Sequence, residues 1–476
     1  VMEFIDREEE LEMLELCYRK SREMLYPVAV MGLRRVGKTR LIFEFIRDKR
    51  FVYFYVNPNK RSLDLLNEFS GILARRLSLP SYVAIRDWSS FIEVLLEFGK
   101  GWVIVFDEFQ YFKDVAPEVF GEFQKWIDLK YDTPMMIIFI GSMIGLMKDI
   151  FENRARPLYD RVKIKMRVKA FPFRRALLLM EKLDIKSFED MARLYLLFGG
   201  YPKYYVSIMD LEVDPGNMGE VIRELFLTEN APFRNEGRIL LGDSERRVYY
   251  SIIEAIALGN RKLSDIASYT GIKQTQLPQY LDDLVYDLEV LLREQPVTAG
   301  PMTRRSLYYI MMPVMEFWFR YLHRNWSLLE LSLEEELLGI IEKDIENLLA
   351  TRFEFLVREF IIDLAKDKRL PIEPRKIGRW WRKKYEIDIL VTGTNKTCLA
   401  ITCRWGRLPL KKALEEIEKT KNASSHIEVK VSNISYGIIA RKLERKEELR
   451  ELGYLAYDLE DMEKFYMESI HQEANP

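Results

Sequence analysis

A glycine-containing run between residues 27 and 39 has the residue types and spacing of a phosphate-binding loop. It reads Pro-Val-Ala-Val-Met-Gly-Leu-Arg-Arg-Val-Gly-Lys-Thr, an apolar segment followed by a G-x-x-x-x-G-K-T pattern. The glycines let backbone N–H groups surround phosphate oxygens, and the N-terminus of a following helix adds positive partial charge. The predicted nucleotide-binding residues are Gly32, Arg34, Arg35, Val36, Gly37, Lys38, Thr39 and Arg40.

Two side chains of this loop have distinct expected tasks. Lys38 is predicted to reach the β- and γ-phosphates, and Thr39 to offer its hydroxyl to Mg²⁺. The alternative is a chance match in a glycine-containing turn. An apolar strand before the loop and helical spacing after it favour the phosphate-binding interpretation.

A second apolar run, residues 101–106, ends in the acids Asp107 and Glu108. A strand that is apolar on both faces is typical of the middle of a parallel sheet, and such sheets bind ligands at the carboxyl ends of their strands. Asp107 is predicted to hold Mg²⁺, and Glu108 to polarise the water that attacks the γ-phosphate. Alternatively, the two acids only begin a surface loop.

Polar side chains beyond the next strand are further candidates. Ser142 follows the apolar run 135–140, where a hydroxyl could sense the γ-phosphate, or it is an ordinary turn residue. Arg154, Arg156 and Arg161 lie beyond the following helix. One of them, with Arg161 our choice, could reach a phosphate in its own molecule or in a neighbour, although surface arginines are common.

The elements that must position these residues alternate between buried strands and helices. Strands are predicted at 51–56, 102–106 and 135–140 with an edge strand at 163–168, and helices at 62–77, 88–98 and 117–129. This alternation predicts an α/β fold with the parallel sheet of a P-loop NTPase. The predicted domains are a P-loop core at 1–170, a helical lid at 171–240, a winged helix-turn-helix at 241–325 and a C-terminal α/β domain at 326–476.

Residues 246–310 have the order of a winged helix-turn-helix, with three helices before two strands at 290–294 and 306–310. Polar side chains on the third helix could face a DNA major groove, with two arginines in the wing. Three acids on the same helix would repel phosphates, so packing between domains is an equal alternative. The polar and basic residues are Lys273, Gln274, Gln276, Gln279, Arg304 and Arg305, and the acids are Asp282, Asp283 and Asp287.

A basic run at 375–384 surrounds Trp380 and Trp381. Basic residues interleaved with aromatic ones suit nucleic acid, and a solvated hairpin is the equal alternative.

Composition sets limits on the class of protein. The chain has 476 residues, a net charge of −1 and three cysteines. Its length predicts several domains, and its charge balance does not favour nucleic-acid or membrane binding by the molecule as a whole. Without a signal peptide or an apolar run of about 18 residues, the expectation is a cytoplasmic protein with no membrane partner. The abundance of Glu, Lys and Arg is typical of a thermophilic source.

Taken together, these motifs resemble those of the archaeal P-loop ATPases of the AAA+/STAND type. The loop, the Asp107–Glu108 pair and Ser142 match the positions that these ATPases use for phosphate, Mg²⁺ and γ-phosphate sensing. The resemblance implies that Ile5, Asp6 and Arg7 lie against the adenine. It also implies that the turn Gly199-Gly-Tyr-Pro202, through Pro202, lies near the base and sugar, and that Pro157-Leu-Tyr-Asp-Arg161 is the family's arginine-bearing segment.

The C-terminal part resembles the nuclease-like domain often fused to these ATPases. The resemblance implies a Mg²⁺ site built from a helix acid, Glu354 or Glu359, the strand acid Asp388, and a Glu-x-Lys on the next strand. Here Thr402 and Arg404 stand at the Glu-x-Lys positions. A neutral hydroxyl holds Mg²⁺ weakly and an arginine does not act as a base, so we expect a degenerate, inactive nuclease fold.

We expect the protein to bind ATP and to be a Mg²⁺-dependent ATPase. It would act as a nucleotide-controlled switch, with ATP/ADP and Mg²⁺ as its cofactors. Double-stranded DNA and a protein partner are the candidate partners, and the sequence leaves the oligomeric state open. The alternatives are an ATP-regulated DNA nuclease and a non-hydrolysing scaffold that retains its nucleotide.

Overall fold

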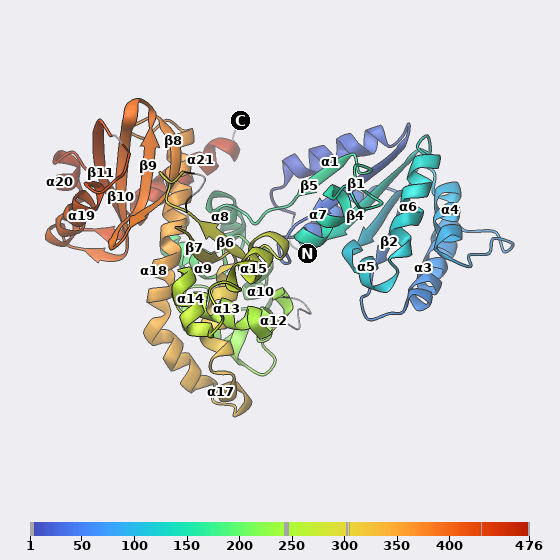
Figure 1. Cartoon of the computed structure of the whole chain (residues 1–476), viewed down its shortest axis with the longest axis horizontal. Coiled ribbons are helices and arrows are strands. Elements are labelled where there is room, and N and C mark those ends of the chain that lie inside the picture. The colour runs from blue at the N-terminus through green and yellow to red at the C-terminus, as the bar shows by residue number, and fades with distance from the viewer. Residues whose placement is uncertain (1–3, 242–246, 301–302, 304, 430, 475–476) are drawn as a thin grey trace. The chain divides into compact units, whose positions relative to one another are not determined.

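The computed structural model describes residues 4–241, 247–300, 303, 305–429 and 431–474 (Figure 1). It divides into two compact units. The first contains the chain up to Ala170 together with the short segments Tyr201–Lys203 and Tyr286–Glu289, and the second contains the remainder. The further division into lid, winged-helix and C-terminal domains stays a prediction.

A parallel sheet forms the centre of the first unit, with the strand order β2-β3-β4-β1-β5. Every residue of β3 and β4 is buried, as expected for strands covered on both faces. Because β4 lies between β1 and β3, the ends of these three strands meet at one carboxyl edge. The strands are β1 (Leu25–Met31), β2 (Phe51–Tyr55), β3 (Val103–Asp107), β4 (Met135–Gly141) and β5 (Ile164–Arg167).

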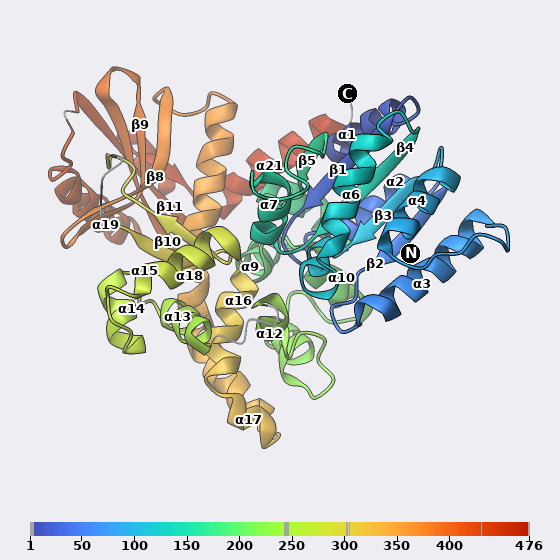
Figure 2. The same cartoon turned by 45° about the vertical axis from the view of Figure 1, so that its right-hand side comes forward.

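Helices cover both faces of this sheet (Figures 1 and 2). Alternate strand residues, among them Phe54, Phe106 and Phe139, enter an aromatic core beneath α3, α4, α6 and α7. The other face is covered by α1 and α2, and Phe43 of α2 stacks on Tyr53. The helices are α1 (Glu8–Lys20), α2 (Lys38–Ile46), α3 (Ser62–Leu77), α4 (Trp88–Phe98), η1 (Phe109–Tyr111), α5 (Phe112–Val115), α6 (Glu118–Leu129) and α7 (Ile144–Glu152).

Helices come first in the second unit. The helices α13, α14 and α15 precede a two-stranded β-hairpin. The two strands of the hairpin, β6 and β7, are antiparallel. The helices before these strands are α8 (Phe173–Lys182), α9 (Phe188–Phe198), α10 (Pro202–Asp210), α11 (Met218–Ile222), η2 (Arg223–Leu227), α12 (Glu236–Leu241), α13 (Arg247–Ala257), α14 (Leu263–Thr270), α15 (Leu277–Asp282) and η3 (Asp283–Asp287). Then come β6 (Leu291–Glu294), β7 (Leu307–Ile310), α16 (Pro313–Phe317), η4 (Trp318–His323) and α17 (Trp326–Glu330).

A second sheet, in the order β12-β11-β10-β9-β8, forms the C-terminal part of this unit. Strands β8, β9 and β10 are antiparallel, whereas β10, β11 and β12 are parallel. The 33-residue helix α18 packs along the sheet (Figure 2). The elements are α18 (Glu334–Lys366), β8 (Pro374–Arg382), β9 (Tyr385–Gly393), η5 (Thr394–Lys396), β10 (Thr397–Leu408), α19 (Leu410–Ser424), β11 (Asn433–Leu443), α20 (Lys446–Glu451), β12 (Leu455–Tyr457) and α21 (Leu459–Ala474).

These two sheets confirm the predicted fold class, a parallel P-loop-type sheet followed by a separate C-terminal α/β sheet. Across the described residues, no helix combines the length and apolar character needed to span a membrane.

Candidate nucleotide-binding site

The predicted phosphate loop connects the end of β1 to the start of α2. Gly37 adopts a left-handed backbone conformation with φ of 93° immediately before the helix. Gly32 passes so close to the end of β5 that a Cβ on it would lie 2.4 Å from the carbonyl oxygen of Val168. Each glycine thus stands where the backbone needs one, because Gly37 has a positive φ and Gly32 leaves no room for a side chain beside Val168.

Lys38, the first residue of α2, folds back over this loop. Its Nζ donates hydrogen bonds to the carbonyl oxygens of Gly32, at 2.7 Å, and Leu33, at 3.0 Å. Burial lowers the pKa of Lys38 to about 8, although the charges of Glu108 and Asp107 act in the opposite direction. The ammonium thus lies within the loop, close to the two acids at the end of β3.

Asp107 ends β3 and accepts three hydrogen bonds. Its Oδ2 accepts from Thr39 Oγ1 at 3.1 Å and from the Tyr53 hydroxyl at 2.5 Å, and its Oδ1 accepts from the Glu108 backbone N–H at 2.8 Å. Burial raises the pKa of Asp107, and the hydrogen bond from Tyr53 opposes that change. One carboxylate and one hydroxyl suit Mg²⁺, which keeps water and phosphate oxygens as its other ligands.

Glu108 contacts the side chain that follows β4. Its Oε2 accepts hydrogen bonds from Ser142 Oγ at 2.7 Å and from Gln110 Nε2 at 2.5 Å. Ser142 is only 5% exposed. The structure thus places five predicted residues together at one edge of the sheet, namely Glu108, Ser142, Asp107, Thr39 and Lys38.

Sequence reasoning missed two residues of this site, Tyr53 and Gln110. Tyr53 of β2 and Asp107 of β3 face the same side of the sheet, and only the pairing of the two strands brings them together. Gln110 follows Glu108 by two residues, a spacing that could have drawn attention to it. It is fully buried, and its Oε1 has no hydrogen-bond partner in the structure.

The N-terminal segment predicted to lie against adenine runs beside the loop. Arg7 is buried, and its guanidinium donates to the carbonyl oxygens of Val36, at 3.2 Å, and Lys169, at 2.6 Å. Its neighbours Ile5 and Asp6 are partly buried. The side chain of Arg7 therefore holds the segment against the loop, and the adenine contact of this segment stays a prediction.

Three other predicted nucleotide-binding residues, Arg34, Arg35 and Arg40, lie in the loop or in the first turn of α2. Arg34 donates to the Tyr111 hydroxyl at 2.9 Å, Arg35 has a positive φ of 71°, and Arg40 is exposed on α2. Pro202 begins α10 and belongs to the first unit. Nearby Gly200 is packed so closely that a Cβ would lie 1.7 Å from the carbonyl oxygen of Phe171, which explains the glycine there.

Arg161 does not lie in the site of its own chain, and the prediction that it acts there is wrong. Its guanidinium forms a salt bridge with Asp128, near the C-terminal end of α6, at 2.9 Å. Helix α6 follows β3 and runs back toward the starts of the strands. Arg161 therefore lies at the edge of the sheet opposite to the phosphate loop, roughly 20 Å away along a seven-residue strand.

Replacing Tyr53 by Phe is expected to weaken the binding of ATP in the presence of Mg²⁺ about tenfold, because Asp107 loses a hydrogen bond that supports its charged form. Calorimetric titration of ATP at fixed Mg²⁺ measures the change. Tyr55→Phe is the matched control, since that tyrosine is 47% exposed on the same strand. Equal affinity in Tyr53→Phe and the wild type would contradict the assignment.

At the predicted nuclease positions, cationic side chains engage the acids. Asp388 Oδ2 accepts from Thr402 Oγ1 at 3.1 Å and from Arg404 Nη1 at 2.9 Å, and Arg404 also pairs with Glu416. Among the residues that the structure describes, no group of three or more His, Cys, Asp or Glu side chains could hold a metal ion. The guanidinium of Arg404 thus lies directly beside Asp388, the predicted strand acid.

The helix acid Glu354 has a similar partner. The buried guanidinium of Arg379, on β8, pairs with both Glu354 and Glu386. The alternative prediction, that Glu359 is the helix acid of this site, is wrong. It faces a different side of α18, where it accepts hydrogen bonds from the Phe173 backbone N–H at 2.7 Å and the Tyr195 hydroxyl at 2.9 Å.

Replacing Glu359 by Gln is expected to flatten the pH dependence of stability between about pH 4.5 and 7. Burial raises the pKa of Glu359 from 4.5 to about 7, so the folded chain holds a proton there that the unfolded chain releases. This stabilisation is complete below pH 4.5 and is lost as the pH rises through 7, a change of roughly 3 kcal/mol. Urea unfolding at several pH values measures it, with the exposed Glu336→Gln as control. An unchanged slope in Glu359→Gln would contradict it.

The residues predicted to contact nucleic acid differ in their exposure. Trp380 is fully buried and Trp381 only 8% exposed, so neither ring is available to a base, and the interpretation of residues 375–384 as a nucleic-acid surface loses its aromatic part. Arg305 pairs with Glu428 at 2.7 Å, and Arg304 lies outside the described residues. The polar side chains beside α15 are exposed, namely Lys273, Gln274, Gln276 and Gln279.

Comparison with protein families and curated proteins gives three matches. Residues 4–208 match the model of an ATPase domain predominantly from Archaea. Residues 318–423 match a model described as Archaea bacterial proteins of unknown function. The chain is also 28% identical over 463 residues to the uncharacterized protein MJECL04 of Methanocaldococcus jannaschii, which covers 96% of this chain and 99% of that protein.

Solved structures show a similar fold. The Walker-type ATPase of Pyrococcus abyssi matches with a TM-score of 0.53 at 20% identity, covering 67% of this chain and 96% of that one. The ORC2 protein of Aeropyrum pernix matches with a TM-score of 0.47 at 14% identity, covering 72% of this chain and 96% of that one. The similarity to the Pyrococcus abyssi structure shows a shared fold.

Proposed function

We propose that the protein binds ATP with Mg²⁺ and hydrolyses it to ADP and phosphate, as the match of residues 4–208 to the model of an ATPase domain predominantly from Archaea supports. The observation that carries this proposal is the pair of contacts at the carboxyl edge of the first sheet. Thr39 contacts Asp107 beside Lys38, and Glu108 contacts Ser142 one strand away.

In this proposal the loop binds the phosphates. Backbone N–H groups between Gly32 and Thr39 surround them, and Lys38 exchanges its bonds to loop carbonyls for bonds to the β- and γ-phosphates. Thr39 and Asp107 would hold Mg²⁺, which when bound neutralises charge on the phosphates and the leaving oxygen.

Glu108 is the residue proposed to orient the attacking water. A carboxylate within hydrogen-bond reach of that water can align it with the γ-phosphate and accept its proton. In the structure one oxygen of Glu108 is held by Ser142 and Gln110. A γ-phosphate would compete for the Ser142 hydroxyl and thereby remove one of the two hydrogen bonds that hold Glu108, which couples nucleotide state to the position of the carboxylate.

We propose that this coupling makes the protein a switch whose second unit engages a partner. The exposed polar side chains beside α15 favour duplex DNA as the candidate. The acids Asp282, Asp283 and Asp287 on the following turns would repel its phosphates, so a protein partner stays the alternative.

The alternative of an ATP-regulated nuclease has less support. Arg404 lies beside Asp388 and Arg379 beside Glu354, so positive side chains occupy the surroundings that a Mg²⁺ ion would need. We therefore expect no metal-dependent cleavage of DNA.

The test is the release of phosphate from ATP by the full-length protein, with and without Mg²⁺ and duplex DNA, alongside plasmid cleavage. Mg²⁺-dependent turnover that DNA stimulates supports an ATPase coupled to DNA, and turnover without stimulation points to a protein partner. ATP that is retained without turnover in all conditions would overturn hydrolysis in favour of a scaffold. Plasmid cleavage would overturn the assignment of a degenerate nuclease fold.

A further inference from the structure

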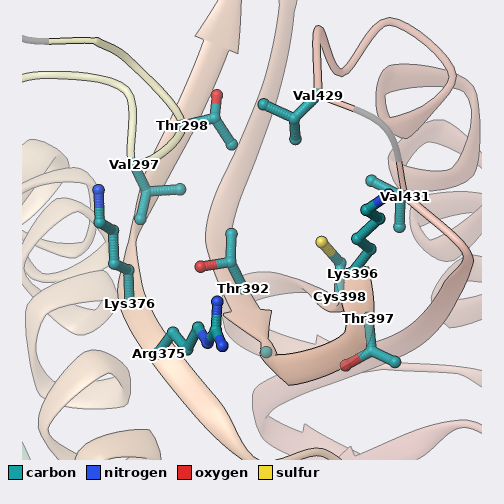
Figure 3. A pocket seen from close by; sticks show the side chains of 11 residues that line it. Val297, Thr298, Arg375, Lys376, Thr392, Lys396, Thr397, Cys398, Val429 and Val431 are labelled. Carbon is teal, nitrogen blue, oxygen red and sulfur yellow. The ribbon is translucent and has the colours of Figure 1, made fainter.

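A pocket opens at one end of the C-terminal sheet (Figure 3). It has a volume of about 300 Å³, and its walls come from β8, the end of β9, the start of β10 and the segment after β6, together with Val429 and Val431 ahead of β11. Cys398 lines it, whereas Thr402 lies four residues further along β10, roughly 13 Å away at the rise of a strand. The pocket is thus separate from the predicted nuclease positions.

One wall of the pocket is apolar and fixed in place. The backbone N–H of Val297 donates to the carbonyl oxygen of Arg379 at 2.9 Å, and its side chain lies over Gly378 of β8. Beside it, the buried hydroxyl oxygen of Thr298 has no hydrogen-bond partner in the structure. A ligand would therefore find both an apolar surface and an uncommitted hydroxyl.

The rest of the lining is positively charged. Arg375, Lys376 and Lys396 line the pocket, and none of its lining residues is acidic. Within the described part of the chain, none of the three has a carboxylate oxygen within 4 Å. The nearby acid Glu428 is paired with arginines outside the pocket, and Glu373 accepts a hydrogen bond from a threonine hydroxyl.

We propose that this pocket binds a phosphate-bearing ligand of nucleotide size, either a free nucleotide or the phosphorylated end of a nucleic-acid strand. Three cations that have no carboxylate oxygen within 4 Å among the described residues suit the doubly charged phosphomonoester, and the valine wall suits the ring of a base. A volume of about 300 Å³ lies at the lower end of the range of small-ligand pockets. The site lies in the second unit and does not depend on ATP hydrolysis in the first.

The test uses the full-length Lys38→Met protein, in which nucleotide binding at the phosphate loop is expected to be about 100-fold weaker. Calorimetry at low salt compares inorganic phosphate, AMP, and a short oligodeoxynucleotide with either a 5′-phosphate or a 5′-hydroxyl. We expect AMP or the phosphorylated strand to bind, and to bind at least tenfold more weakly to the triple variant Arg375→Gln, Lys376→Gln, Lys396→Gln. The triple variant Lys368→Gln, Lys383→Gln, Lys384→Gln alters exposed cations outside the pocket and is the matched control.

The arms of this experiment separate the sources of the phosphate. Binding of AMP but neither strand supports a free nucleotide, and tighter binding of the phosphorylated strand than of AMP or the hydroxyl strand supports a strand end. The proposal is overturned if no probe binds, or if both triple variants lose affinity equally. Lys396→Glu, a single change at an exposed position, provides a second variant should the triple variant unfold.

Discussion

Replacing Glu108 by Gln is expected to lower the rate of ATP hydrolysis at least about 100-fold while leaving the affinity for ATP within about threefold of the wild type. The amide keeps the shape of the side chain but cannot accept a proton from water. Binding is expected to persist because the loop, Lys38 and the Thr39–Asp107 pair are unchanged. Steady-state phosphate release measures the rate, and equilibrium titration of ATP measures the affinity.

The exposed Glu97→Gln, on α4, is the matched control, since it makes the same chemical change away from the site. It is expected to leave both quantities unchanged. A Glu108→Gln protein that turns over ATP at the wild-type rate would show that another group activates the water. Loss of ATP binding in this variant would instead show that Glu108 supports the structure of the loop.

Replacing Lys38 by Met is expected to weaken ATP binding about 100-fold, or roughly 3 kcal/mol, because an ammonium that can contact two phosphates is lost from a buried position. Met retains the length of the stem, so the packing of α2 is expected to persist. Titration of ATP at fixed Mg²⁺ measures the loss, and thermal unfolding without nucleotide checks the fold. Unchanged affinity would contradict the phosphate-binding role of the loop.

The same lysine predicts a pH dependence. Burial lowers the pKa of Lys38 to about 8, so above this pH the side chain loses the proton that phosphate binding needs. The affinity for ATP is expected to fall about tenfold per pH unit above 8, with no such dependence in Lys38→Met. Between pH 8 and 10.5 only the unfolded chain retains this proton, so Lys38 itself makes the first unit more stable as the pH rises there. A flat affinity from pH 7 to 9.5 would contradict the assignment.

Much of the first sheet and its loop could be predicted from the sequence because the signals are local. The glycine spacing at 32 and 37 reflects the backbone of one turn, and the continuous apolar runs before Asp107 and Ser142 reflect strands buried on both faces. Chain order and the carboxyl-edge rule then predicted that Lys38, Thr39, Asp107, Glu108 and Ser142 meet.

Only the tertiary structure decided which side chains contact them. The pairing of β2 with β3 brings Tyr53 to Asp107, and the course of α6 carries Arg161's partner Asp128 to the far edge of the sheet. In the second unit, packing between distant segments buries Trp380 against β9, β10 and α19, and it brings Arg379 of β8 to Glu354 of α18. Residue spacing determines where a helix or strand lies along the chain, whereas these contacts depend on strand order, register and burial between distant segments, which local periodicity does not encode.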